Sequence, residues 1–243
     1  MAIEEQHLKG KYAVVTGGTR GIGRAISERL LRDGATVALC GRTRASAERA
    51  AAELSQATGG EALGIAADVS RLEDVRRFFE TVAERFPGLD VLVNNAGAGA
   101  FASVDRLTPA EWHSMIDLNL TGVFYCCHYA LPLIKQRGGG FVINISSLAG
   151  KNPFAGGAAY NASKFGLNGF SEAMMLDLRY DKIRVSYIMP GSVDTDFGGQ
   201  AGRSEWKIAP EDVAEVAAML LRMPERTLVS RVEMRPSRPP RKP

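Results

Sequence analysis

The stretch KYAVVTGGTRGIG, residues 11–23, sets an apolar run directly before a glycine-rich turn. The run predicts a short buried strand, and the pattern of residues 22–32 predicts the helix that follows. Gly17, Gly21 and Gly23 have the spacing G-x-x-x-G-x-G, which permits a tight turn and a close approach of the backbone to a pyrophosphate. The free N–H groups and the positive end of the helix favour the same phosphates. The stretch therefore predicts a strand–turn–helix unit that holds a dinucleotide, with a merely structural turn as the alternative.

A Walker phosphate loop is another alternative for this turn, and the sequence argues against it. Gly18 and Gly23 have the separation that such a loop requires. However, Arg24 and Ala25 stand where a Walker loop needs Lys followed by Ser or Thr.

Short apolar segments alternate with longer amphipathic ones along the rest of the chain. Strands are expected at 11–16, 36–40, 62–67, 91–94, 141–146, 184–188 and 227–232. Helices are expected at 22–32, 44–57, 71–85, 110–136, 159–179 and 210–222. Such an alternation is typical of a parallel sheet that is covered on both faces. We therefore predict an α/β fold: a single doubly wound (Rossmann) domain with a seven-stranded parallel sheet flanked by helices on both faces.

Length and composition agree with one globular domain. The chain has 243 residues, 45% of them apolar and 23% charged, which excludes a disordered chain, a collagen-like repeat and a disulfide scaffold. We assign residues 1–234 to this domain, including a long loop at 194–209, and residues 235–243 to a basic, proline-rich tail expected to be disordered. The four cations of the tail exceed the net charge of +3, so the body of the protein is close to neutral. A nucleic-acid partner is therefore not expected.

The cysteines and the N-terminus predict a reduced, cytoplasmic protein. The three cysteines lack C-x-x-C spacing and lie in apolar stretches, so we expect buried free thiols at Cys40, Cys126 and Cys127. The N-terminus carries early acids and no apolar core of a secretory signal. No run approaches the ~18 apolar residues of a membrane span, so no membrane partner is expected. The three histidines make no ligand spacing, and no metal site is expected.

The residues after the second expected strand indicate which dinucleotide is bound. Cys40 is followed by Gly41, Arg42 and Thr43, where an acid would bond the ribose 2′-hydroxyl of NAD and repel a 2′-phosphate. Arg42 instead offers a guanidinium that forks onto a phosphate, with Arg20 available from the glycine turn. NADP(H) is favoured over NAD(H); two merely solvated arginines are the alternative.

Tyr160 and Lys164 are four residues apart, on one face of an expected helix. A tyrosine has an ordinary pKa near 10, and a neighbouring ammonium favours its ionised form. Such a pair acts as proton donor or acceptor for a carbonyl/alcohol couple. The spacing alone is weak evidence, because it is common on helix surfaces.

The combination of motifs is far more specific than any one of them. The glycine turn at 16–23 is joined by Asn94–Gly97 after the fourth strand, Ser147 thirteen residues before Tyr160, and Lys164. Further matches are Asp68-Val69, Asn119 within Asp-Leu-Asn-Leu-Thr-Gly, and the segment 190–195. Together these motifs resemble the short-chain dehydrogenase/reductase family over residues 8 to 232.

The resemblance implies a role for each matching residue. Tyr160 is the expected catalytic acid/base, Ser147 bonds the substrate oxygen, Lys164 holds the nicotinamide ribose and lowers the pKa of the tyrosine, and Asn119 holds a water that links Lys164 to solvent. Ser146 is the neighbouring alternative to Ser147. The expected cofactor-binding residues are Gly17, Thr19, Arg20, Gly21, Ile22, Gly23, Arg42, Asp68, Val69, Asn95, Ala96, Gly97, Tyr160, Lys164, Pro190, Gly191, Val193 and Thr195.

The predicted function is an NADPH-dependent carbonyl reductase in which Tyr160 donates the proton. The alternatives are an NAD(P)-dependent alcohol or sugar dehydrogenase and, in another class, a non-catalytic dinucleotide sensor. The chain looks most like the 3-oxoacyl-carrier-protein reductase branch, although Val-Glu-Met-Arg-Pro and the basic tail replace its glycine-rich C-terminus. The resemblance also implies a homo-oligomer, a tetramer or dimer, through helices 110–136 and 159–179.

The loop at 194–209 is long enough to be a functional lid over a small-molecule carbonyl substrate. Phe197 and Trp206 lie on this loop. Together with Phe101, which follows the Asn94–Gly97 segment, and Phe154, which follows Ser147, they are candidates for an apolar pocket, with ordinary packing as the alternative.

Overall fold

The computed structural model describes residues 7–197 and 204–240, and within them the chain forms one parallel sheet of seven strands. The strands are β1 (Tyr12–Val15), β2 (Thr36–Gly41), β3 (Ala62–Ala66), β4 (Val91–Asn94), β5 (Gly140–Ile145), β6 (Ile183–Pro190) and β7 (Arg231–Met234). Their order across the sheet is β3-β2-β1-β4-β5-β6-β7. The predicted fold class is confirmed.

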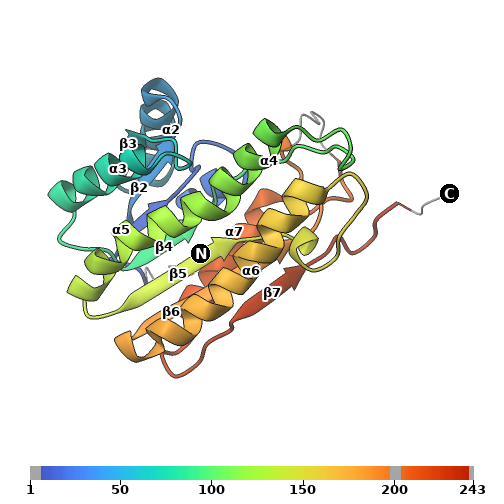
Figure 1. The fold of residues 1–243 in the computed structure, drawn as a ribbon. Helices are drawn as coiled ribbons and strands as arrows, with labels where there is room; N and C mark the ends of the chain where they lie inside the picture. Colours follow the sequence, from blue (N-terminus) through green and yellow to red (C-terminus); the bar gives the residue numbers. More distant parts are fainter. Residues whose placement is uncertain (1–6, 198–203, 241–243) are drawn as a thin grey trace.

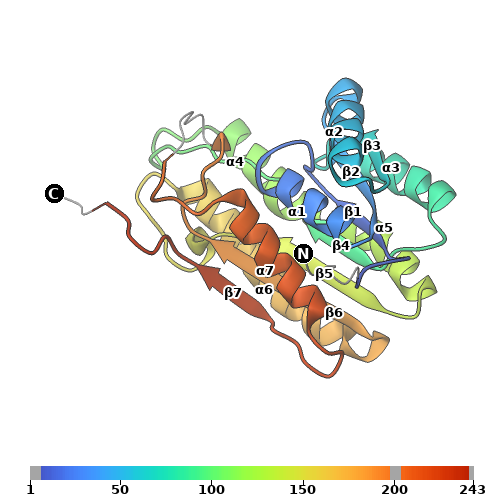
Figure 2. The ribbon, with the colours of Figure 1, turned by 180° about the vertical axis from the view of Figure 1, so that it is seen from behind.

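Helices cover both faces of the sheet (Figures 1 and 2). They are α1 (Gly21–Arg32), α2 (Arg44–Thr58), α3 (Leu72–Arg85), α4 (Pro109–Ile116), α5 (Gly122–Gln136), α6 (Ala158–Leu178) and α7 (Pro210–Arg222). Helices α1, α2 and α7 pack on one face, whereas α3, α5 and α6 pack on the other. None of the described helices is both long and apolar enough to cross a bilayer.

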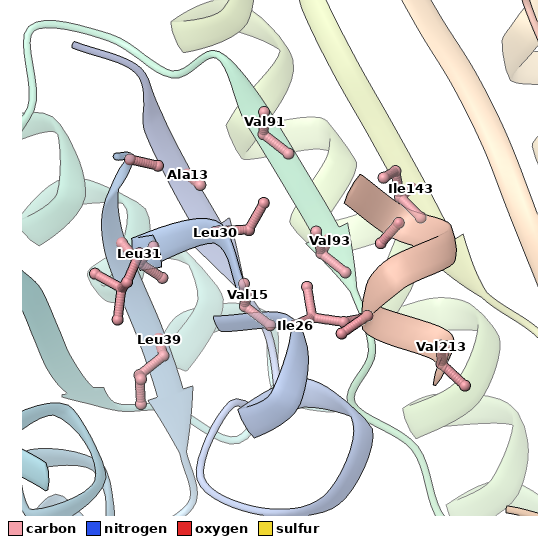
Figure 3. Packing of buried hydrophobic residues seen from close by; sticks show 14 of the residues in the cluster. Ala13, Val15, Ile26, Leu30, Leu31, Leu39, Val91, Val93, Ile143 and Val213 are labelled. Atoms are coloured by element: carbon pink, nitrogen blue, oxygen red, sulfur yellow. The ribbon is translucent and has the colours of Figure 1, made fainter. Parts of the chain in front are cut away.

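The core consists of two apolar layers because successive strand residues point to opposite faces. In β1, Ala13 and Val15 face α1 and α7, whereas Val14 faces the α3–α5–α6 side. Figure 3 shows the first layer, where Ile26 and Leu30 of α1 lie against the side chains of the central strands. The predicted buried free thiols are confirmed, and those of Cys126 and Cys127 belong to the second layer.

The order of strands reverses between β1 and β4, so the chain leaves these neighbouring strands in opposite directions across the sheet. In doubly wound sheets this switch point opens a crevice at the carboxyl ends of the strands. The segments that follow β4, β5 and β6 gather at the same end of the sheet, beside α4 (Figure 1). The fold therefore brings the glycine turn and the Tyr160 helix to one edge.

The structure corrects two expected elements. The last strand is β7, Arg231–Met234, rather than 227–232, because the Thr227 N–H bonds the carbonyl of Pro224 in a turn that postpones pairing with β6. The expected helix 110–136 is α4 and α5 joined by a π-helical turn, η1 (Asp117–Thr121). Part of the predicted loop at 194–209, residues 198–203, and the tail residues 241–243 lie outside the described residues.

Candidate active site

Thr16 fastens the glycine turn to the segment after β4. Its buried hydroxyl oxygen accepts hydrogen bonds from the N–H groups of Asn95 and Ala96, each at 3.0 Å. The Asn95 amide in turn donates to the carbonyls of Thr16 (3.0 Å) and Gly17 (3.1 Å). Sequence reasoning quoted Thr16 as part of the motif but gave it no role; its position directly before the glycines was the signal.

The glycine turn is a cradle that side chains would fill. Gly17 and Gly21 have φ values of +64° and +54°, in the left-handed region that favours glycine. A Cβ at Gly23 would lie 2.3 Å from the Asn95 amide nitrogen and 2.4 Å from the Gly17 oxygen. The turn runs straight into the N-terminus of α1, where backbone N–H groups lack helical partners. Its shape and donors therefore fit the pyrophosphate of a dinucleotide.

Two arginines lie just beyond the carboxyl ends of β1 and β2. Arg20, the residue before α1, and Arg42, the residue after β2, are both exposed, and neither has an acidic partner within the part of the chain that the structure describes. Thr19 packs against Gly41, whose Cβ would lie 2.5 Å from the Thr19 methyl carbon. Two exposed guanidiniums without carboxylates are available to an anionic group.

Asp68 and Val69 follow β3, the strand that pairs with β2. The Asp68 carboxylate accepts hydrogen bonds from the N–H (3.0 Å) and hydroxyl (2.7 Å) of Ser70, which fixes the turn after the strand. Val69 is buried, and its carbonyl lies against Gly122 at the start of α5, where a Cβ would approach it to 2.6 Å.

Ser147 and Tyr160 meet at the carboxyl end of β5. Tyr160 lies in the first turn of α6 and is only 8% exposed, and burial raises the pKa of its phenol. The Ser147 side chain interacts with that of Tyr160 and acts in the opposite direction, lowering that pKa. The alternative, Ser146, donates its hydroxyl to Asn168 instead. Of the two serines, Ser147 is therefore the one whose side chain interacts with Tyr160.

Lys164 lies one turn further along α6 and is almost completely buried. Its ammonium donates to the Ile145 carbonyl at 2.9 Å and lies 5.9 Å from the centre of the Tyr160 ring. Burial lowers the pKa of Lys164 to about 8. On balance the pKa of the Tyr160 phenol is raised, because burial outweighs the opposing effect of Ser147.

Asn119 lies in the π-helical turn η1 and is fully buried. Its amide nitrogen donates to the Ala98 carbonyl (3.0 Å) and the Ser163 hydroxyl (3.1 Å), and its oxygen accepts from the Ala98 N–H (3.0 Å). Gly97 lies between this amide and the Lys164 ammonium, because a Cβ there would be 3.2 Å from the former and 3.9 Å from the latter. The side chain thus fastens the 97–98 turn to α6.

Sequence reasoning missed the polar residues that support this site from α6. Asn161 donates to the Ala149 carbonyl at 2.7 Å, and Asn168 donates to the Gly150 carbonyl at 3.0 Å, so both hold the segment after Ser147. The signal was their spacing of seven residues, which places them on one face of the helix that carries Tyr160. Their partners could not be predicted, because those lie on a distant segment.

The segment after β6 closes the site. Gly191, which follows Pro190, donates its N–H to the Met234 carbonyl of β7 at 2.8 Å. Val193 pairs with Ile208 in a short bridge, which joins the two ends of the loop. Thr195 then reaches the glycine turn, where a Cβ on Gly21 would lie 3.2 Å from its methyl carbon.

Trp206 lies apart from the ring contacts that join Phe101, Phe154 and Phe197 to Tyr160. It lines a hollow of about 590 Å³ between the loop and the first tail residues, 235–238.

The chain is similar to known proteins of one family. A profile of short chain dehydrogenases matches residues 11–206. A 3α-hydroxysteroid dehydrogenase of Mediterraneibacter gnavus is 36% identical over 190 residues, covering 78% of this chain and 76% of that protein.

Two solved structures are similar over nearly the whole chain. A metagenomic short-chain oxidoreductase in complex with NADP is 39% identical with a TM-score of 0.84, covering 96% of this chain and 99% of the other. A 3-ketoacyl-ACP reductase of Sinorhizobium meliloti 1021 is 34% identical with a TM-score of 0.84, covering 92% and 96%.

Proposed function

The chain belongs to the short-chain dehydrogenase family, and on that premise we propose that it is a carbonyl reductase that uses NADPH. It is an oxidoreductase of CH–OH and C=O groups; the direction of reaction and the preferred cofactor are our proposal. The observation that carries the proposal is that the buried Tyr160 and Lys164 lie together on α6, with the Lys164 ammonium 5.9 Å from the Tyr160 ring and bonded to the end of β5 two residues before Ser147.

In this proposal Ser147 and Tyr160 bind the same carbonyl oxygen. Both hydroxyls donate to it, and Tyr160 transfers its proton as the oxygen gains negative charge. The neutral phenol is the form that donates this proton, and burial favours the neutral form. Lys164, with a pKa of about 8, is mostly charged at pH 7 and stabilises the negative charge that the phenol leaves behind.

The cofactor proposal is supported by the chain's own donors. The glycine turn would hold the pyrophosphate, Arg42 and Arg20 would meet the 2′-phosphate, and Asp68 and Val69 would contact the adenine. Asn95, Ala96, Gly97 and Lys164 would line the nicotinamide side, with the segment 190–195 opposite. When bound, NADPH supplies the hydride. The structure of a relative with NADP agrees with this choice.

The substrate is a small carbonyl compound, and the relatives suggest two kinds. One is a 3-oxoacyl thioester, as the name of the Sinorhizobium reductase indicates, and the other is a ketosteroid, as the name of the Mediterraneibacter dehydrogenase indicates. The position of Tyr160 beside Ser147 and Lys164 argues against a non-catalytic sensor.

We also propose a homo-oligomer. Phe124 of α5 and the α6 residues Phe165 and Leu176 are 45–56% exposed on the outer helices, where a second copy would cover them.

The test is NADPH consumption with a panel of ketones and aldehydes that includes a 3-oxoacyl thioester and a 3-ketosteroid. Tyr160→Phe should lower kcat by about 10²–10⁴-fold while NADPH still binds, because only the transferable proton is removed. Tyr180→Phe, at a tyrosine that is 91% exposed, is the matched control and should be neutral. Retention of more than about a tenth of the wild-type kcat by Tyr160→Phe would remove Tyr160 from this role.

A further inference from the structure

Three phenylalanines from three separate loops meet around Tyr160. Phe101 follows β4, Phe154 lies between β5 and α6, and Phe197 follows β6. The ring centre of Phe101 is 5.7 Å from that of Tyr160, as is the ring centre of Phe197. Phe154 joins the group through Phe101, again at 5.7 Å. We call these three residues the phenylalanine cluster.

The backbone holds the cluster in place. Ala102 pairs with Gly157 in a short parallel bridge, which ties the loop of Phe101 to the loop of Phe154. The N–H of Gly157 also donates to the Phe154 carbonyl at 3.1 Å, and Phe197 donates its N–H to the Thr195 hydroxyl at 3.3 Å. The three rings therefore converge because fixed loops present them.

Glycines make room for the rings. A Cβ at Gly99 would lie 2.7 Å from the ring of Phe197 and 2.8 Å from the ring of Phe101. A Cβ at Gly157 would lie 2.7 Å from the ring of Phe154. Because Gly99 and Gly157 have no side chain, the three phenyl rings can lie directly against the backbone at these positions.

The rings remain open to solvent although they touch. Phe101, Phe154 and Phe197 are 50%, 46% and 42% exposed, whereas Tyr160 beneath them is buried. Exposed apolar side chains that gather in one patch mark a binding surface, whereas scattered ones need no explanation. The charge nearest in sequence to Phe154, the Lys151 ammonium, is paired with Glu233 of β7.

We propose that the phenylalanine cluster is the specificity surface of the active site and that it selects carbonyl substrates whose chain ends in a flat, apolar ring. The inference rests on the proposed function, because the ring must be bound while its carbonyl meets Tyr160 and Ser147. Phenyl side chains prefer a ring that meets them edge-to-face or offset-stacked, and a flexible alkyl chain offers no such geometry. A substrate of this kind covers the exposed rings, whereas a sugar would leave its hydroxyls against them without partners.

The test compares two methyl ketones with ten carbons each, 4-phenyl-2-butanone and 2-decanone, under NADPH. They share the reacting group and differ in whether the tail is a ring or a chain. Wild type should favour the phenyl ketone in kcat/KM by about tenfold. Phe101→Leu and Phe197→Leu should each reduce that ratio by about 2- to 12-fold, mainly through KM, because leucine keeps an apolar side chain but not the ring.

Tyr180→Leu is the control, since Tyr180 is 91% exposed beyond the C-terminal end of α6 and its loss should leave the ratio unchanged. Far-ultraviolet circular dichroism and Tm of each variant verify that it is folded. A wild type that favours 2-decanone, or a ratio that survives all three cluster substitutions including Phe154→Leu, overturns the specificity proposal while the reductase proposal stands. If wild type reduces neither ketone nor the other carbonyls of the panel, the proposed function itself fails.

Discussion

At the scale of single residues, the buried charge of Lys164 lowers the stability of the folded protein. Burial lowers the pKa of its ammonium from 10.5 to about 8, while an unfolded chain titrates near 10.5. Below pH 8 the folded protein therefore holds a buried charge at a cost of roughly 3 kcal/mol, which the bond to the Ile145 carbonyl partly offsets. As pH rises from about 8 to 10.5 the folded lysine becomes neutral first, so the penalty disappears.

Lys164→Met should accordingly stabilise the protein at pH 7 while abolishing turnover. We expect a gain of about 1–2 kcal/mol in the free energy of unfolding, after loss of the Ile145 hydrogen bond, and a Tm higher by about 2–8 °C. The gain should shrink toward pH 10. Urea unfolding at pH 7 and 9.5 measures it, with the exposed Lys135→Met as control. A variant that is less stable than wild type at pH 7 would contradict this view of Lys164.

Arg42 is the residue on which cofactor preference should depend. A charge-assisted hydrogen bond to the 2′-phosphate contributes about 1.5–3 kcal/mol, so wild type should prefer NADPH over NADH by at least about tenfold in kcat/KM. Arg42→Ala should weaken that preference and Arg42→Glu should invert it, with Arg20 retaining part of the attraction. Gly41→Asp is a less clean test, because its Cβ would lie 2.5 Å from the Thr19 methyl carbon.

The control for Arg42 is Arg44→Ala, at an exposed arginine paired with Glu48 on α2. Both cofactors are compared at two ionic strengths, and the preference should fall as salt screens the exposed pair. Equal kcat/KM values for the two cofactors in wild type would show that Arg42 does not read the phosphate.

At the scale of elements, α6 carries Tyr160 and Lys164, and its two central glycines have different surroundings. Gly166 faces Leu120, and a Cβ there would lie 2.8 Å from that side chain. Gly169 is exposed, and a Cβ there would meet nothing within 4 Å. Glycine inside a helix is less favourable than alanine by about 0.5–1 kcal/mol.

Gly169→Ala should therefore raise the free energy of unfolding by about 0.5–1 kcal/mol and Tm by about 1–4 °C, without change in kcat. Gly166→Ala gains the same helix propensity but must displace Leu120, so it should be less stabilising. Thermal unfolding of the two variants compares them directly. A destabilised Gly169→Ala would mean that another surface, such as a second subunit, covers this position.

At the scale of the whole molecule, two apolar layers on the sheet hold the domain together, and the C-terminal tail adds little to either. Arg235 and residues 237–240 are exposed, and Pro236 is half-buried beside Gly191. Truncation after Met234 should thus leave Tm within about 2 °C of wild type and turnover nearly unchanged. Truncation after Pro240 is the control. A fall in Tm of more than about 4 °C would show that the contact at Gly191 stabilises the fold.

The sequence by itself determined the order of elements, the glycine turn and the Tyr160–Lys164 pair, because each is a local pattern. Alternation, helical spacing and turn residues depend on neighbours within about one or two helical turns. Helix 210–222 was predicted to the residue for this reason. Even the last strand was recognised, although its start depended on pairing with β6 and was misplaced.

Only the tertiary structure decided which residues from distant segments contact each other. Thr16 binds Asn95 across 79 positions, and Asn119 bonds Ser163 across 44. No local pattern contains such pairs, since they depend on the order of strands in the sheet. The direction of the Tyr160 pKa was likewise beyond prediction, because it depends on how completely distant segments bury the phenol. The same reason explains the phenylalanine cluster: its three rings lie far apart in the sequence, and only the fold brings their three loops together.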